Sequence, residues 1–443
     1  MPAETHKLPF IWNGVPGLLR PLGCVELFFH LYAQVYPVHF CLCAEIEGTV
    51  DAAALRPALD QVRERHPILQ ARIAHDEELG TAFYKSSRPI ELKTIYAWKD
   101  ADWRPTVERE LQRPMGNGSG ALLRVTALRA PDVTTIVLTF HHAIADGLSA
   151  VWILHDILSA LAGEQLEAFK SFSPIEEKIL GPSPRPARTS ERPARASEPD
   201  RAAPVLLQTP PSALLLPANL RTNIDTAEFT KEETARLVEQ CRANDTTVHS
   251  TICAAAARCV PASGHDTVGI TSPFSLRKQA GIENGACGVF IGAATAEVRI
   301  KETASIWHDA RHVGDSLNKA RSPQAVINFI AKVSAEFSPV AGHEKVVAFL
   351  SDWPQTAVVV SNLGVLPIAE RYGPRAVRAV WGPAMLTNLP ENRQTIGVCT
   401  FGGQLRIVHQ SYAPVRGLAT AIWNAMIAAC GSWQPPDNSR KSR

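Results

Sequence analysis

The stretch that decides the fold is TTIVLTFHHAIADG, residues Thr134–Gly147, in which an apolar segment leads into two histidines and an Asp-Gly pair. The segment TTIVLTF is β-branched and almost wholly apolar, which predicts a central strand covered on both faces. The pattern that follows, from Leu148 to the glycine at Gly163, predicts a helix. A strand that feeds directly into a helix indicates α/β layers.

Strands alternate with helices on both sides of this stretch. Strands are predicted at residues 39–48, 68–74, 122–130, 267–277 and 356–364, with a hairpin turning at Gly402-Gly403. Helices are predicted at residues 51–67, 230–245 and 247–260. Thr230 is a candidate N-cap with Glu233 at the capping-box position, and the last of these helices has small residues that allow close packing.

A change in composition divides the chain. Ten of its 33 prolines and six arginines lie in residues 171–222, which predicts an exposed connection because proline blocks helix continuation and removes backbone donors. We therefore expect an N-terminal lobe at 1–170, a Pro/Arg-rich linker at 171–222, a C-terminal lobe at 223–431 and a polar tail at 432–443.

Composition excludes several classes of protein. The net charge of this 443-residue chain is +2, which is unlike the basic excess of nucleic-acid-binding proteins. No run of about 18 apolar residues is present, so no membrane-spanning helix is expected. The first 40 residues do not resemble a secretory leader. Nine cysteines without CxxC spacing indicate reduced core residues of a cytoplasmic protein.

The segment HHAIADG is the strongest candidate for chemistry. Adjacent strand residues point to opposite faces, so only one of His141 and His142 is expected to face an opening at the strand's end. Histidine titrates near neutral pH and can accept a proton there. From these residues alone, two hydrogen-bonded core histidines remain an equal alternative. No metal is expected, because HHxxxD is not a familiar ligand spacing and no Cys or Glu cluster accompanies it.

Other catalytic motifs are missing from the sequence. There is no GxSxG nucleophile elbow and no glycine-rich phosphate loop, which disfavours serine hydrolase and nucleotide chemistry. A cysteine nucleophile has no signature here, although spacing alone does not exclude it.

The HHxxxDG motif after an apolar strand resembles that of the CoA-dependent acyltransferase superfamily. Within that superfamily, the segments RPLGCVELFF from Arg20, IEGTVDAAALRPALDQVRERHPILQARI from Ile46, TVHSTICAAAA from Thr247 and SPFSLRK from Ser272 are similar to polyketide-associated acyltransferases and nonribosomal peptide synthetase condensation domains. The resemblance covers about nine tenths of the chain. The DFGWG motif of the plant branch is missing, and VWGPAMLTN from Val380 keeps only Trp-Gly-Pro.

This resemblance implies an α/β fold of two chloramphenicol-acetyltransferase-like lobes, each a mixed sheet backed by helices, with the active-site tunnel between them. By the same resemblance, His142 is the general base and His141 is structural. Asp146 pairs with Arg277 and fixes the loop that carries His142, while Gly147 keeps the tunnel free of a side chain. Ser361 and Asn362, in VVVSNLG, are candidates to face the acyl group or the oxyanion, or are ordinary strand-end polar residues.

The function implied is transfer of an acyl group from a thioester to a hydroxyl or amine, giving an ester or amide, through a ternary complex. No bound cofactor is expected, and the thioester of coenzyme A or of carrier-protein phosphopantetheine is the co-substrate. The expected partners are an acyl or peptidyl carrier protein and a small alcohol or amine, not nucleic acid. An inactive docking or scaffold domain is the alternative, and the intact HHxxxDG disfavours it.

Overall fold

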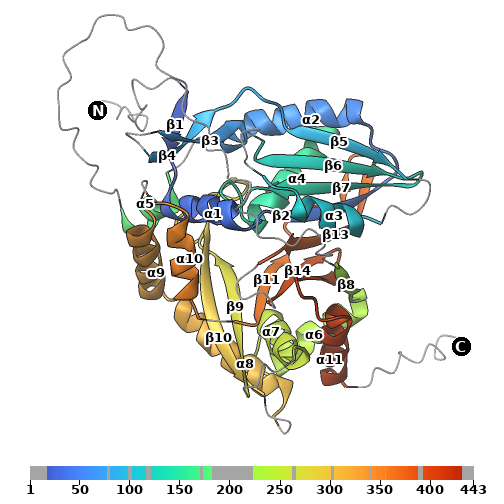
Figure 1. The fold of residues 1–443 in the computed structure, drawn as a ribbon. Coiled ribbons are helices and arrows are strands. Elements are labelled where there is room, and N and C mark those ends of the chain that lie inside the picture. The colour runs from blue at the N-terminus through green and yellow to red at the C-terminus, as the bar shows by residue number, and fades with distance from the viewer. Residues whose placement is uncertain are drawn as a thin grey trace, which may run out of the picture.

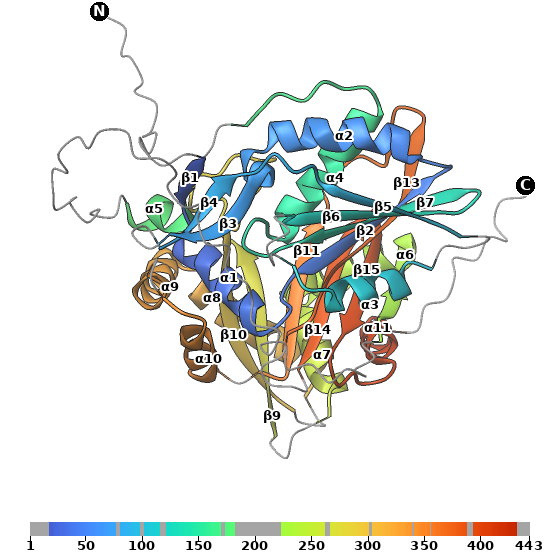
Figure 2. The same ribbon diagram turned by 45° about the horizontal axis from the view of Figure 1, so that its top comes forward.

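The computed structural model describes most of the chain in detail. The described residues are 17–76, 80–97, 102–115, 121–169, 173–181, 223–261, 266–300, 304–338, 341–354, 356–387 and 393–431. They form two lobes, each built on a six-stranded sheet, and a small third sheet (Figures 1 and 2). The two-lobed α/β architecture expected from the sequence is confirmed.

The N-terminal lobe is centred on the predicted apolar strand. Its sheet has the order β12 (Arg371–Tyr372), β13 (Arg375–Met385), β2 (Phe40–Glu47), β7 (Val133–Phe140), β6 (Leu123–Arg129) and β5 (Glu91–Tyr96). Strand β7 pairs antiparallel with both β2 and β6. Seven of its eight residues, from Thr134 to Phe140, are at most 1% exposed, as expected for a strand covered on both faces.

Helices cover both faces of this sheet. Helices α2 (Ala52–Arg65) and α4 (Gly147–Leu161) pack together on one face, and α3 (Arg104–Gln112) packs against β2 and β7 from the other. Asp51 caps α2, since its carboxylate accepts a hydrogen bond from the backbone N–H of Ala54. Helix α1 (Cys24–Val35) lies at the end of the sheet, beside the small sheet of β1 (Leu18–Pro21), β4 (Gly80–Lys85) and β3 (Ala71–Asp76).

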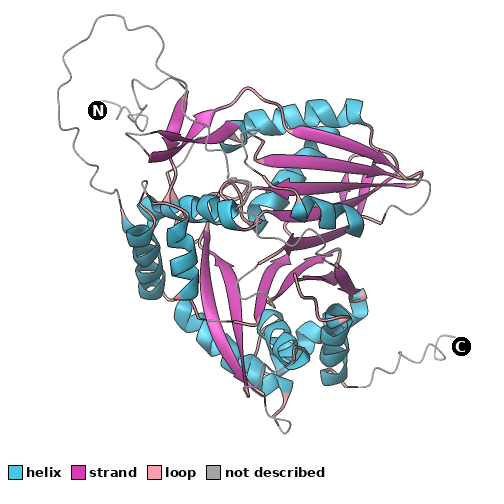
Figure 3. Ribbon diagram, viewed as in Figure 1, coloured by secondary structure: helices cyan, strands magenta, loops and turns pink. Residues whose placement is uncertain are grey.

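The C-terminal lobe repeats the plan of a mixed sheet backed by helices. Its strand order is β10 (Ile291–Arg299), β9 (Thr267–Ser275), β11 (Val358–Val365), β14 (Gln394–Phe401), β15 (Gln404–Gln410) and β8 (Asp225–Glu228). The helices that cover it are α6 (Lys231–Ala243), α7 (Val248–Cys259), α8 (Ile306–Ala320) and α11 (Leu418–Ala429) (Figure 3).

Several local predictions for this lobe are confirmed. Thr230 and Glu233 form the capping box of α6, and β14 and β15 form the hairpin that turns at Gly402-Gly403. The four consecutive alanines of α7 are fully buried, which lets the helix approach the sheet closely. Helices α9 (Pro323–Glu336) and α10 (Glu344–Ser351) lie at the edge of the lobe, and both contact α1.

The sheets do not divide at the proline-rich stretch. Strands β12 and β13 come from the C-terminal half of the sequence, yet they complete the N-terminal sheet by pairing with β2. Strand β13 also lies against β14, so it joins the two lobes (Figure 1). Within the predicted linker, residues 175–180 form helix α5 (Ile175–Leu180), which packs on α9. Residues 182–222 and the tail at 432–443 lie outside the described residues, and the domain boundaries stay a prediction.

The crossing of β13 and β14 depends on a residue without a side chain. A Cβ atom at Gly397 would overlap the backbone carbonyl of Pro383, and a backbone carbonyl has no rotamer by which to move away. We expect Gly397→Ala to destabilise the protein by about 3 kcal/mol, at the upper end of the usual cost of overpacking. The measurement is the thermal unfolding midpoint, followed by circular dichroism.

Gly314→Ala is the matched control for this substitution. Gly314 lies inside α8, where alanine is intrinsically favoured, and its new Cβ would meet only the Ser250 hydroxyl at 3.3 Å. Its midpoint should stay close to that of the wild type. Equal midpoints for both variants would show that β13 and β14 do not approach each other as described.

Candidate active site

The two histidines lie just beyond β7 rather than on it. The strand ends at Phe140, and residues 141–145 form a turn in which the Ile144 N–H donates to the His141 carbonyl at 3.1 Å. The alternation of side chains along a strand therefore does not decide where the two rings point. Both rings instead contact helix α1, at Phe29 and His30.

The His142 ring is held between aromatic side chains. It stacks on Phe29 with ring centres 3.9 Å apart and planes 8° apart, and Phe40 lies at 5.0 Å on a tilted plane. Its Nδ1 atom is buried and has no hydrogen-bond partner among the described residues, while 8% of the residue remains exposed. Stacking restricts the ring to one orientation, because aromatic pairs prefer defined geometries.

Burial decides the protonation state of His142. Removal from water lowers the pKa of the ring to about 4, and the backbone carbonyls of His142 and Ala145 and the Asp146 carboxylate oppose this shift only in part. The ring is therefore neutral at neutral pH. A neutral imidazole has a free lone pair and can accept a proton.

His141 is more deeply enclosed than His142. It is 1% exposed, its Nδ1 accepts the backbone N–H of Ala143 at 3.1 Å, and the His30 ring lies 5.9 Å away. Burial lowers its pKa well below the ordinary histidine value, and the nearby His30, His39 and His142 rings add to the shift. These contacts are those of a packed core residue that shapes the turn.

Asp146 connects the turn, helix α4 and the opposite lobe. Its Oδ1 accepts from the Ser149 N–H at 2.7 Å, which caps α4, and from Arg277 Nη2 at 3.1 Å. Its Oδ2 accepts from the Phe290 N–H at 3.0 Å. Asp146 is 2% exposed and Arg277 6%, so the ion pair expected from the sequence is present and buried.

Arg277 is fixed on several sides. Its Nη1 donates to the Ala286 carbonyl at 2.9 Å, its Nη2 donates to the Ser149 hydroxyl at 2.7 Å, and its guanidinium lies over the Phe290 ring at 4.6 Å. Ser149 in turn donates to the Gly288 carbonyl at 2.7 Å. Since Arg277 follows β9 and Ser149 lies on α4, this network ties the two lobes together beside His142.

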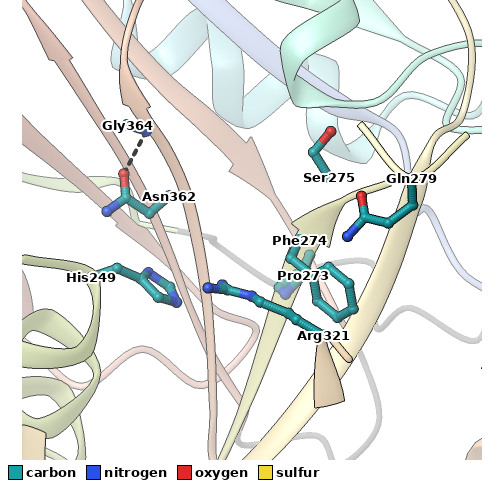
Figure 4. Close-up of a pocket in the computed structure, with 8 residues that line it drawn as sticks. All are labelled: His249, Pro273, Phe274, Ser275, Gln279, Arg321, Asn362 and Gly364. Carbon is teal, nitrogen blue, oxygen red and sulfur yellow. Dashed lines mark hydrogen bonds between the residues drawn. The ribbon is translucent and has the colours of Figure 1, made fainter. Parts of the chain in front are cut away.

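Gly147 marks a second contact between the lobes. A Cβ atom there would come within 2.5 Å of Leu363, so the absence of a side chain allows β11 to approach the start of α4. Ser361 and Asn362 precede Leu363 on β11 and are half-buried. Asn362 Oδ1 accepts from the Gly364 N–H at 2.8 Å, and Asn362 lines a pocket with His249 and Arg321 (Figure 4).

The structure adds residues that the sequence did not single out. Ser149 could have been found, because an Asp N-cap is followed three residues later by the backbone N–H that it accepts. Phe29, His249 and Arg321 carry no such signal, because each lies more than 90 residues from the motif. Only the folded chain places Phe29 against His142 and brings His249 and Arg321 into one pocket.

Metal and thiolate chemistry find no support in the described ranges, where no group of three or more His, Cys, Asp and Glu side chains could hold a metal ion. All nine cysteines are unpaired, and eight are buried. Burial raises the pKa of Cys41, Cys253 and Cys399 to about 12 and raises that of Cys287 further, which disfavours an activated thiolate. In the same ranges, no helix is both long and apolar enough to cross a membrane.

Two family sequence models match the chain, one in each half. The model described as the condensation domain matches residues 28–185. The model described as the C-terminus of phthiocerol/phthiodiolone dimycocerosyl transferase matches residues 218–410. Both agree with the resemblance seen in the sequence.

Individual proteins show the same similarity at low identity. A nonribosomal peptide synthetase of Curvularia clavata is 24% identical over 344 residues, which is 73% of this chain and 2% of the synthetase. The chain likewise spans about 2% of the length of the first curated relatives it matches.

Solved structures share the fold over nearly the whole chain. Polyketide synthase associated protein 5 from Mycobacterium tuberculosis superposes with a TM-score of 0.63 and 15% identity, over 95% of this chain and 100% of that one. The first condensation domain of the CDA synthetase gives 0.65 and 14%, over 94% and 97%. At these identities the similarity shows the fold alone.

Removing Arg277 tests the network between the lobes. In Arg277→Met the Asp146 carboxylate keeps two backbone N–H donors but loses its counter-charge, so we expect destabilisation of about 3 kcal/mol, the lower end for a broken buried ion pair. Arg378→Met is the control, since its contact with Glu47, at 3.4 Å, is exposed and worth at most about 1 kcal/mol. Similar thermal midpoints for the two variants would contradict the buried network.

Proposed function

The chain belongs to the superfamily of condensation domains and polyketide-associated acyltransferases, and we propose that it transfers an acyl group from a thioester to a hydroxyl or amine. The product is an ester or an amide in natural-product or lipid biosynthesis. The observation that carries the proposal is the neutral, stacked His142 ring beside the junction of the two lobes, on a turn anchored by Asp146 and Arg277.

His142 is the general base of the proposed reaction. Its Nδ1 is buried, so we assign Nε2 as the nitrogen that takes the proton. As the acceptor oxygen or nitrogen attacks the thioester carbonyl, its proton passes to Nε2. The carbon–sulfur bond then breaks, and the proton returns from the imidazolium to the leaving thiolate. General-base catalysis of this kind contributes about 10²–10⁴-fold to the rate.

The other motif residues position the base. His141 fills the core beneath the turn, and Asp146 with Arg277 holds the turn to both lobes. Gly147 lets Leu363 approach, which brings β11 and its Ser361 and Asn362 toward the motif. We assign these two residues to substrate binding, with the Asn362 amide nitrogen as a donor because its Oδ1 already accepts from Gly364.

The donor is either coenzyme A or a carrier protein, since both present an acyl group as a phosphopantetheine thioester. The thioester is already activated, so the proposed reaction needs no metal or redox cofactor. The alternative function is a docking domain without catalysis. The buried ion pair and the stacked His142 favour the enzyme, because a docking role needs neither.

We expect His142→Ala to reduce acyl transfer by about 10²–10⁴-fold while the thermal midpoint changes little. Because the pKa of His142 is lowered to about 4, the wild-type kcat/KM should remain level as the pH falls from 7.5 to 5.5 and should decline only nearer 4. An unshifted histidine would lose activity around pH 6.5. Circular dichroism at each pH separates this loss from acid unfolding.

A loss below tenfold in His142→Ala would show that this residue is not the base. His141→Ala is the companion variant, and it should lower the soluble yield because it removes a buried, hydrogen-bonded ring from the core. A folded but inactive His141→Ala protein beside an active His142→Ala protein would exchange the two roles.

The kinetic mechanism is the second test. A base without an enzyme nucleophile requires both substrates to be bound together, so initial-rate plots should intersect rather than run parallel. Incubation with acyl donor alone should add no acyl mass to the protein. Parallel plots together with a stable mass increase at one residue, for example Cys287 or Ser361, would replace direct transfer by an acyl-enzyme mechanism.

A further inference from the structure

A pocket of about 360 Å³ lies on the C-terminal lobe, between the ends of β9 and β11 and the end of α8. Figure 4 shows Arg321, His249 and Asn362 around it, with Phe274 and Gln279 on the side of β9. No acidic residue lines the pocket. Its single fully ionised side chain is Arg321, so the pocket carries a positive charge.

Arg321 lacks the carboxylate partner that several other buried or half-buried arginines have. Arg124, Arg258 and Arg277 each contact a carboxylate, at 2.7, 2.6 and 3.1 Å respectively. Arg321 is half-buried and forms no ion pair within the described part of the chain, and its buried Nε has no hydrogen-bond partner there. Its guanidinium lies 5.4 Å from the centre of the Phe274 ring. Removal from water lowers the pKa of Arg321. The direction of this shift shows that burial destabilises a charge that has no partner of opposite sign.

Neutral donors surround the guanidinium. Asn362 Oδ1 is engaged by Gly364, so its amide nitrogen is available to a ligand. His249 Nε2 lies 2.7 Å from the Ser272 hydroxyl, and its Nδ1 is buried without a partner among the residues described. Gln279, at the exposed rim, adds a side-chain amide. One cation with several neutral donors and no carboxylate suits a carboxylate or phosphate group.

Two walls of the pocket continue to the HHxxxDG turn. The Ser275 hydroxyl lines the pocket and accepts the backbone N–H of Arg277, at 3.3 Å, and Arg277 binds Asp146. On the other wall, Asn362 precedes Leu363, which packs where Gly147 has no side chain. The pocket walls are therefore linked to the turn through Arg277 on one side and Leu363 on the other.

We propose that this pocket binds an oxyanion group of one of the two substrates, with Arg321 as its counter-charge and Asn362 as a donor. The inference rests on the proposed acyl transfer, because it assigns the anion to a substrate of that reaction. The anion is either the phosphate of the donor's phosphopantetheine arm or an acid group on the acceptor. In both cases the pocket selects substrates by charge at a point remote from the reacting carbonyl.

The test compares two probes that differ only in the phosphate. Isothermal titration calorimetry at low ionic strength measures the binding of 4′-phosphopantetheine and of pantetheine to the full chain, and inorganic phosphate serves as a third probe. The variants are Arg321→Gln and, as a charge-matched control, Arg311→Gln. Arg311 lies on α8 and its Nη1 donates to the exposed Asn244 carbonyl. We expect Arg321→Gln to weaken anion binding by about 10–100-fold and Arg311→Gln to leave it unchanged.

The probes distinguish the two sources of the anion. Preference for phosphopantetheine over pantetheine that disappears in Arg321→Gln identifies the donor's phosphate. Arg321-dependent binding of inorganic phosphate, with no difference between the two pantetheines, identifies an acid group on the acceptor. Binding of all three probes that is equal in wild type and Arg321→Gln overturns the proposal.

These outcomes are independent of turnover. If the protein transfers acyl groups but shows no Arg321-dependent anion binding, only the assignment of this pocket fails. If it binds the anion through Arg321 but transfers no acyl group from either donor, the pocket stands as a binding site and the proposed acyl transfer fails.

Discussion

The buried ion pair between Asp146 and Arg277 is the interaction on which the rest of the site depends. Taking two charges out of water is costly, and the cost is offset only when every remaining donor and acceptor is also satisfied. Ser149, Ala286 and Phe290 meet most of that requirement with hydroxyl and backbone groups from both lobes, whereas the buried Arg277 Nε has no hydrogen-bond partner among the described residues. The pair is thus a constraint on geometry: either lobe can shift only by leaving a charge unpaired. The same contacts hold the turn that carries His142 in place, because Asp146 is both the ion-pair partner of Arg277 and the cap of α4.

The same low-polarity surroundings set the chemistry of the histidine pair. Burial disfavours the imidazolium form, so His142 rests as a neutral ring that can take a proton and give it up again. His30, His39 and His141 are also buried, and burial lowers their pKa values as well. All four histidine rings are therefore neutral at neutral pH. These rings are protonated in the unfolded chain below about pH 6.5 but resist protonation in the folded protein. The free energy of unfolding therefore decreases as the pH falls from about 6.5 toward 4.

Local sequence signals predicted much of the fold, and long-range placement accounts for what they missed. The apolar run at 134–140, the cap at Thr230 and the Gly402-Gly403 turn act over a few residues, so the sequence alone placed them correctly. Local signals could not predict the pairing of β13 with β2. This pairing depends on which free strand edge is available to β13 in the folded chain. In the site, the resemblance supplied Asp146 and Arg277 as a pair, and the structure shows them in contact. The stacking of Phe29 on His142 and the unpaired charge of Arg321 depend on residues that are far apart in the sequence. Only the folded chain shows them.

The return of β13 to the N-terminal sheet has a consequence for synthesis on the ribosome. Strand β2 ends at Glu47 and its edge partner begins at Arg375, about 330 residues later. At about 5–20 residues per second, roughly 16 to 66 s separate the emergence of the two strands. Throughout that interval β2 presents an open row of backbone donors and acceptors to other nascent chains, as any uncovered edge strand does. The N-terminal lobe is therefore a poor candidate for a separately expressed fragment, and early arrest of translation would release a chain prone to edge-to-edge association.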